Sequence, residues 1–195
     1  MPRIRYIEED EKTDEARELI ASAERTGAPD PRVVSIMTRH QTAGVPWVKY
    51  WHSLLYDGLL PHTLKELCRI FMSMEQECGY CSTVRSKVAQ AEGLTEEKVR
   101  ALPDFETSEL FDARERAALR FARRFKLGGA AIDDDAVFDD LKEHFTEEEI
   151  IELGHLCAQA DGMGKLVKSF SVISWGEACA LNPDLLATKS AIAAE

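Results

Sequence analysis

The stretch Thr63-Leu-Lys-Glu-Leu-Cys-Arg-Ile-Phe-Met-Ser-Met-Glu75, followed directly by Gln76-Glu-Cys-Gly-Tyr-Cys-Ser82, decides the fold class of this protein. The apolar residues of its first part recur mostly three or four positions apart, which places their side chains on one face of a helix. They are Leu64, Leu67, Cys68, Phe71, Met72 and Met74. The pattern predicts a helix over residues 63–75 that leads into two cysteines separated by two residues.

Helical patterns extend on both sides of this stretch. Apolar residues at helical spacing, together with the residues that start and stop helices, predict further helices. Those helices cover residues 14–25, 33–40, 45–56, 82–91, 113–126 and 150–172, with shorter ones behind Thr95 and Asp133. Alternating runs of the kind that form strands are nearly absent, so the sequence predicts an all-α protein.

Local capping signals mark where several of these helices begin. Thr13 stands where it can cap the first helix, and three stretches have the capping-box pattern, in which the first and fourth residues satisfy each other's backbone. They are Thr63-Leu-Lys-Glu66, Asp112-Ala-Arg-Glu115 and Thr146-Glu-Glu-Glu149. We expect one domain, with a helical N-terminal extension over residues 1–44, a core over 45–175 and a C-terminal tail over 176–195.

Composition excludes several classes of function. The chain has 195 residues, 45% of them hydrophobic, and a formal net charge of −11. Nucleic acid and anionic membrane surfaces would repel such a protein, and no apolar run is long enough to span a bilayer. No signal peptide is recognisable, and five cysteines are an odd number for a secreted disulfide framework. We therefore expect a cytoplasmic protein.

The pair Cys78 and Cys81 has three possible explanations: a thiol–disulfide centre, half of a zinc site, or two buried thiols without chemistry. At the start of a helix, backbone N–H groups and the helix dipole stabilise the reactive thiolate. A four-cysteine zinc site needs a second cysteine knuckle, and Cys68, Cys157 and Cys179 each stand alone. A thioredoxin-type centre would follow a strand rather than a helix. The pattern favours a dithiol redox centre in a helical protein.

The segment from Leu60 through Cys81 resembles the carboxymuconolactone decarboxylase/AhpD-like family. The likeness continues through Gly93-Leu-Thr-Glu-Glu97, Phe111-Asp-Ala-Arg-Glu-Arg-Ala-Ala118 and Phe145-Thr-Glu-Glu-Glu-Ile-Ile-Glu-Leu153, and covers about residues 45–172. The resemblance implies an AhpD-like helical bundle that forms homo-oligomers, as trimers, multiples of trimers or dimers. It also implies either a dithiol peroxidase or disulfide reductase, or a decarboxylase that acts on a small acid or lactone.

The AhpD-like pattern is a glutamate, eleven residues, Cys-x-His-Cys, three residues and a histidine. Glu66, Cys78 and Cys81 match it, whereas Tyr80 and Arg85 stand where the two histidines would be. By resemblance, Cys81 is the attacking thiol, Cys78 the resolving thiol, and Glu66 part of a proton relay. Arginine cannot act as a base, but its charge, four residues after Cys81, could lower the pKa of that thiol.

Each of these neighbours also has a structural explanation. Glu66 could close the capping box at Thr63, Tyr80 could pack beside the cysteines or bond a sulfur, and Arg85 could form an exposed ion pair. His52 and His155 are candidates for a replacement base, while the other histidines adjoin helix ends and fit capping or surface roles. Those are His40, His62 and His144. Apolar residues that fit either a substrate pocket or core packing are Trp47, Trp51, Phe71, Met72, Met74 and Met163.

Three functions remain from the sequence. The first is a dithiol oxidoreductase acting on a small-molecule or dithiol substrate and re-reduced by an unknown reductant, with thiol–disulfide exchange favoured over hydroperoxide reduction. The second is the decarboxylase activity, and the third is a redox sensor or scaffold without turnover. For each we expect no cofactor, no metal and no nucleic-acid or membrane partner.

Overall fold

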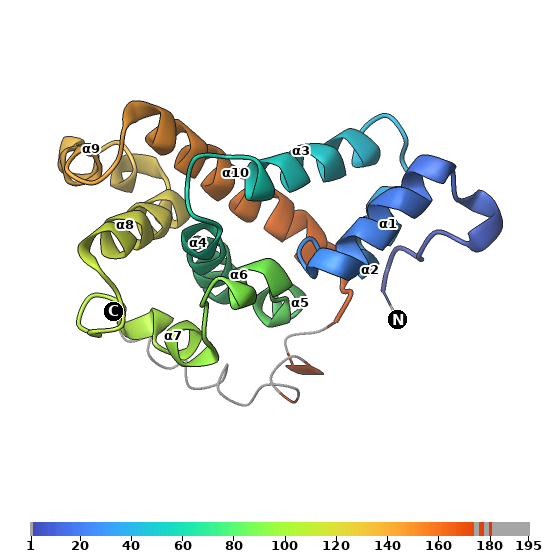
Figure 1. The fold of residues 1–195 in the computed structure, drawn as a ribbon, viewed down its shortest axis with the longest axis horizontal. Helices are drawn as coiled ribbons and strands as arrows, with labels where there is room; N and C mark the ends of the chain where they lie inside the picture. Colours follow the sequence, from blue (N-terminus) through green and yellow to red (C-terminus); the bar gives the residue numbers. More distant parts are fainter. Residues whose placement is uncertain (1, 174–175, 178–179, 181–195) are drawn as a thin grey trace.

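A computed structural model describes residues 2–173, 176–177 and 180 (Figure 1). Throughout these residues the regular structure is helical and no strand occurs, which confirms the predicted all-α, single-domain fold. None of the described helices is both long and apolar enough to cross a membrane. Cys179 and most of the predicted C-terminal tail lie outside the described residues.

Helix α4 (His62–Glu75) is the central element, and it packs against α10 (Glu147–Phe170) and α8 (Ala113–Leu127) (Figure 1). The other α-helices are α1 (Asp14–Thr26), α2 (Pro31–Met37), α3 (Gly44–Tyr56), α5 (Gly79–Thr83), α6 (Lys87–Ala91), α7 (Glu96–Arg100) and α9 (Asp135–Lys142). Short 3-10 turns cover Glu9–Glu11, Leu102–Asp104 and Gly129–Ala131. Every side chain of α4 except those at its ends is thus enclosed by other helices.

The core is made of two clusters of buried side chains. The larger cluster surrounds α4 and joins it to α8 and α10, with Leu67, Cys68 and Leu153 fully buried. The smaller cluster joins α2 and the C-terminal part of α10 to the cysteine pair, and includes Val34 and Val167. The cysteine pair therefore lies where the N-terminal helices meet the central bundle.

Most helix starts follow the capping signals in the sequence. Thr13 accepts the backbone N–H of Ala16 at the start of α1, and complete capping boxes open α8 and α10. A cap of this kind contributes about 1 kcal/mol because it satisfies backbone donors that the helix itself leaves unpaired. For helices with a strong capping signal, the predicted first residue therefore lies close to the observed one.

Two local predictions were wrong. Helix α4 begins one residue before Thr63 and has Pro61 as its N-cap, without a side-chain cap, so Glu66 does not close a capping box there. The helix predicted over residues 82–91 is two short helices, because Val84 is extended and Ser86 caps the start of α6. Arg85 therefore lies in the break and not on the helical face of Cys81.

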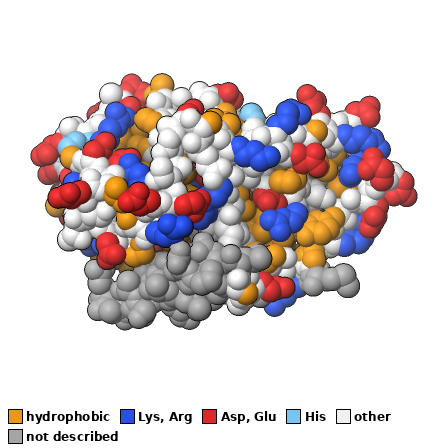
Figure 2. All heavy atoms as spheres, turned by 60° about the horizontal axis from the view of Figure 1, so that its bottom comes forward, with side chains coloured by type: hydrophobic (Ala, Val, Ile, Leu, Met, Phe, Trp, Pro, Cys, Tyr) orange, Lys and Arg blue, Asp and Glu red, His pale blue; other side chains and the backbone are white. Residues whose placement is uncertain are grey.

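Charged side chains of both signs are interspersed on the face of the molecule drawn in Figure 2. Lysines and arginines stand beside aspartates and glutamates there, with apolar side chains between them. Ion pairs between exposed side chains, such as Arg5 with Glu11, contribute little to stability. A buried exception is the pair Lys65 and Glu152, in which the lysine is 1% exposed and also donates to the carbonyl of Leu54 at 2.7 Å. That pair fastens the end of α3 to α10.

Candidate functional site

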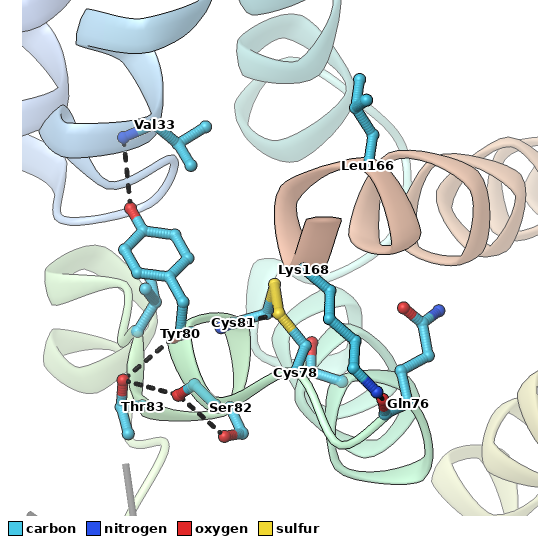
Figure 3. The surroundings of a disulfide bond; sticks show 12 residues. Val33, Gln76, Cys78, Tyr80, Cys81, Ser82, Thr83, Leu166 and Lys168 are labelled. Carbon is cyan, nitrogen blue, oxygen red and sulfur yellow. Dashed lines mark hydrogen bonds between the residues drawn. A yellow bond between two sulfur atoms is a disulfide. The ribbon is translucent and has the colours of Figure 1, made fainter. Parts of the chain in front are cut away.

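Cys78 and Cys81 are joined by a disulfide bond, with their Cα atoms 5.3 Å apart (Figure 3). Cys78 is the N-cap of α5, and its sulfur accepts the backbone N–H of Cys81 at 3.2 Å. Cys78 is buried, with 1% of its surface exposed, whereas Cys81 is partly exposed. The two sulfurs therefore differ in access, and Cys81 is the one that a molecule from outside can reach.

A pocket with a cavity volume of about 70 Å³ opens beside Cys81, and its walls come from α3, α4, α5, α10, the segment 28–30 and Val33 of α2. Its walls are mostly apolar, and Trp47 and Trp51 contribute stacked indole rings whose centroids are 6.4 Å apart. Trp47 also donates its ring N–H to Gln159 at 2.9 Å, which fixes the ring against α10. Of the apolar residues considered from the sequence, Trp47, Trp51 and Met163 line this pocket, while Phe71, Met72 and Met74 belong to the core.

Arg69, which the sequence analysis did not single out, joins the cysteine segment to α4. Its guanidinium donates to the carbonyl oxygens of Cys81 at 2.9 Å and Val84 at 2.8 Å, and its side chain lines the pocket. It also forms two hydrogen bonds with Glu66, at 2.6 and 2.9 Å. The spacing of Glu66 and Arg69, three residues apart on a predicted helix, was a signal for this pair that could have been read from the sequence.

Glu66 is completely buried and accepts the backbone N–H of Ser86 at 3.2 Å in addition to its bonds with Arg69. Burial alone would raise the pKa of Glu66, but the charge and hydrogen bonds of Arg69 outweigh it and hold the pKa below its usual value. An ionised carboxylate with its acceptors occupied does not readily take up a proton at neutral pH. The geometry thus places Glu66 where it holds Arg69 in position.

Arg85 is directed to a different set of partners. It forms an ion pair with Glu96, with 2.8 Å between its Nε atom and a carboxylate oxygen, and donates to the carbonyl oxygens of Ser82 and Val84. It is not among the residues that line the pocket. Arg85 therefore caps the end of α5 and ties it to α7.

Tyr80 is buried beside the cysteines, and its hydroxyl accepts the backbone N–H of Val33 at 3.3 Å (Figure 3). Burial, reinforced by the nearby carboxylate of Asp30, raises the pKa of Tyr80 far above its usual value. The guanidinium of Arg32 lies over the ring, 5.0 Å from its centroid. Tyr80 thus packs against the N-terminal helices and stays protonated, and its hydroxyl is bonded away from the sulfurs.

The two histidines considered as replacement bases are placed apart from Cys81. His155 is exposed and shares a hydrogen bond of 2.6 Å with Tyr50, and His52 packs against Tyr56 with tilted rings whose centroids are 4.7 Å apart. Neither lines the pocket. His62, expected at the surface or in a cap, is instead 7% exposed and bonds the hydroxyl of Ser86 at 2.7 Å. No sequence signal distinguished it, because its partner lies 24 residues away.

The positions of the other described cysteines bear on the alternative of a zinc site. Cys68 and Cys157 are free thiols buried in the larger core cluster. Among the described residues no group of three or more histidine, cysteine, aspartate or glutamate side chains is arranged to hold a metal ion.

Comparisons with known proteins fit this architecture, an all-helical fold with a cysteine pair at the start of a short helix. Residues 45–124 match the model of the carboxymuconolactone decarboxylase family. The chain is 23% identical over 104 residues to the uncharacterized protein YdfG of Bacillus subtilis (strain 168), which covers 53% of this chain and 71% of that protein. The predicted family resemblance is therefore confirmed for residues 45–124.

Two solved structures have the same fold. The apo crystal structure of the debrominase Bmp8 superposes with a TM-score of 0.74 and 21% identity, covering 96% of both chains. A cysteine-to-alanine variant of that debrominase in complex with 2,3,4-tribromopyrrole gives a TM-score of 0.71, at 21% identity over 97% of this chain and 96% of the other. At this level of identity, the likeness establishes the fold.

Proposed function

We propose that this protein is a dithiol oxidoreductase in which Cys81 attacks the substrate and Cys78 resolves the intermediate. The observation that carries the proposal is the difference between the two sulfurs: Cys81 lies at a pocket, while Cys78 is buried behind it within disulfide distance. A nucleophile needs access to its substrate, whereas a resolving thiol needs access only to its partner.

The reaction on a small disulfide balances with these two thiols alone. The Cys81 thiolate attacks one sulfur of the substrate, a mixed disulfide forms, and the first thiolate leaves. The Cys78 thiolate then attacks Cys81, which forms the intramolecular disulfide and releases the second thiolate. An external dithiol reduces the pair again. The two electrons that the substrate gains are thus those that the cysteine pair loses.

Hydroperoxide reduction makes a demand that thiol–disulfide exchange does not. A hydroperoxide releases hydroxide or alkoxide, which needs a proton donor, whereas a thiolate is a good leaving group at neutral pH. Arg69 and Arg85 stay charged and Glu66 stays ionised, while the Tyr80 hydroxyl accepts from Val33, donates to Asp30 and has a strongly raised pKa. We therefore expect disulfide reduction to be faster than hydroperoxide reduction.

The test is steady-state turnover of the purified protein with dithiothreitol as reductant, on a small aromatic disulfide and on cumene hydroperoxide. We expect turnover of the disulfide at a rate at least ten times that of the hydroperoxide. Cys81→Ser should abolish the reaction, and pre-reduced Cys78→Ser, mixed with the disulfide in the absence of dithiothreitol, should stop at a trapped mixed disulfide. Cys68→Ala is the matched control, because Cys68 is a free thiol outside the pocket. Faster hydroperoxide turnover, or full activity in Cys81→Ser, would refute the proposal.

A second candidate is reductive removal of a halogen from a small aromatic molecule. The pocket at Cys81 favours it, because its stacked tryptophan rings offer an aromatic wall to a small ring. Its stoichiometry would be one aryl halide and two thiols converted to one arene, one disulfide, one halide ion and one proton. Release of bromide from a brominated pyrrole or phenol, with loss of the signal in Cys81→Ser, is the measurement that distinguishes it from disulfide reduction.

A further inference from the structure

Arg69 has a hydrogen-bonding capacity that the protein itself does not fill. Its guanidinium carries five N–H donors, and four of them go to Glu66, Cys81 and Val84. The Nη1 atom makes one of these bonds, to the carbonyl oxygen of Cys81, and its second N–H has no acceptor among the described residues. A buried donor without an acceptor lowers the stability of the folded protein, because it has lost its hydrogen bond to water. An acceptor in the pocket would recover that free energy.

Of the buried ion pair between Arg69 and Glu66, only the positively charged member faces the pocket. Arg69 is 7% exposed and lines the pocket, whereas its counter-ion Glu66 is completely buried and is not part of the wall. Asp30 does line the pocket, but its carboxylate is paired with Arg32, with 3.0 Å between the Nε and Oδ1 atoms. A ligand in the pocket thus meets the guanidinium of one ion pair and a carboxylate that is already neutralised.

The remaining walls are suited to a flat ring. Trp47 and Trp51 stack with an interplanar angle of 10°, and Met163 and Val167 supply apolar and polarisable surface from α10. Aromatic walls with a few placed polar groups are typical of small-molecule sites. The net charge of −11 disfavours anions at long range, but exposed charges beyond about 8 Å are largely screened at physiological salt. Local contact with Arg69 would then dominate binding.

We propose that the pocket beside Cys81 binds small planar aromatic anions, with the ring against Trp47 and Met163 and the negative group on the free N–H of Arg69. The inference rests on the proposed function, because it names the class of molecule that would be presented to Cys81. Arg69 would be a binding residue that sets specificity, and Glu66 would hold it in place.

The experiment is calorimetric titration of the disulfide form of the protein with benzoate and with benzamide, which have the same shape and differ in charge. We expect benzoate to bind at least ten times more tightly. The double variant Glu66→Gln with Arg69→Met, which removes both buried charges together, should lose that preference. Arg85→Gln is the matched control, since Arg85 lies outside the pocket wall, and it should keep the preference.

A second measurement needs no variant. In the reduced wild-type protein, benzoate should slow the alkylation of Cys81 by iodoacetamide by a factor of five or more, and benzamide at the same concentration should have little effect. Equal binding of the two molecules, absence of binding by both, or a preference retained in a folded double variant would each overturn the proposal. The titration requires no turnover. If the protein binds benzoate but reduces no disulfide, the proposed function is refuted and the binding proposal stands.

Discussion

The two pairs of cysteines in the described part of the chain show how environment decides the chemistry of one residue type. Cys68 on α4 and Cys157 on α10 lie in the larger core cluster, where burial raises the pKa of Cys68 to about 12 and that of Cys157 well above its usual value. Cys78 and Cys81 lie at the start of a short helix, and one of them borders a pocket. Burial without a counter-charge suppresses a thiolate, whereas a helix start and an open wall favour it.

Alkylation of the reduced protein should separate the two pairs most strongly. At pH 8 we expect iodoacetamide to modify Cys81 at least a hundred times faster than Cys68, because a thiol with a pKa of about 12 is almost entirely protonated there and is also enclosed. Mass spectrometry of the digested protein gives the rate at each cysteine. Comparable rates in the folded protein would show that burial does not distinguish the two pairs.

Removal of Arg69 should be the most damaging single change beside the cysteine pair. Arg69→Met leaves the carboxylate of Glu66 buried without its partner, which typically destabilises a protein by about 3–5 kcal/mol. The addition of Glu66→Gln should recover part of the loss. Urea unfolding of the two variants measures both effects. A single variant as stable as the wild type would mean that the ion pair contributes nothing to stability.

Acid should lower the stability of the folded protein by protonating Glu66 in its ion pair with Arg69. The folded-state pKa of Glu66 lies below the unfolded value of about 4.5, so the stability it contributes is present above that pH and is lost as pH falls through the folded pKa. Thermal unfolding followed from pH 6 downwards should therefore show a steeper loss in the wild type than in the Glu66→Gln, Arg69→Met double variant. Parallel curves would assign the acid sensitivity to other groups.

The smallest expected effect is at Tyr80. Tyr80→Phe removes the acceptor for the backbone N–H of Val33 and should cost about 1 kcal/mol, measured by urea unfolding. Turnover of a small disulfide should change less than threefold, because the hydroxyl is bonded to α2 and not to a sulfur. A large loss of activity with unchanged stability would instead give the hydroxyl a role in the reaction.

Prediction from the sequence succeeded where the signal was local. Capping boxes and apolar spacing identified the starts of α8 and α10, and the spacing of Cys78 and Cys81 indicated a disulfide centre. Prediction failed where residues far apart in the sequence contact each other, or where one residue fits two different local patterns. Glu66 fits a capping box in sequence, but its ion pair with Arg69 and its bond to Ser86 belong to the folded interior.

The pocket itself was the least predictable feature. Its walls come from α2 and the segment before it, α3, α4, α5 and α10, and only packing brings Trp47 to Cys81. Arg85 shows the same limit: it was placed on the helix of Cys81 because the extended conformation of Val84 has no clear signature in the sequence. Side chains four positions apart meet only when the helix between them is continuous.

The pocket wall on α10 and the cysteine pair belong to different helices, so the shape of the pocket can vary independently of the cysteines. The wall residues Gln159, Met163 and Val167 lie four positions apart on one face of that helix, whereas the two sulfurs lie at the start of α5. Substitutions along that face would reshape the pocket without moving the reacting atoms. Related proteins could therefore diverge in what they accept through a single helix, and directed evolution of this chain would begin most economically there.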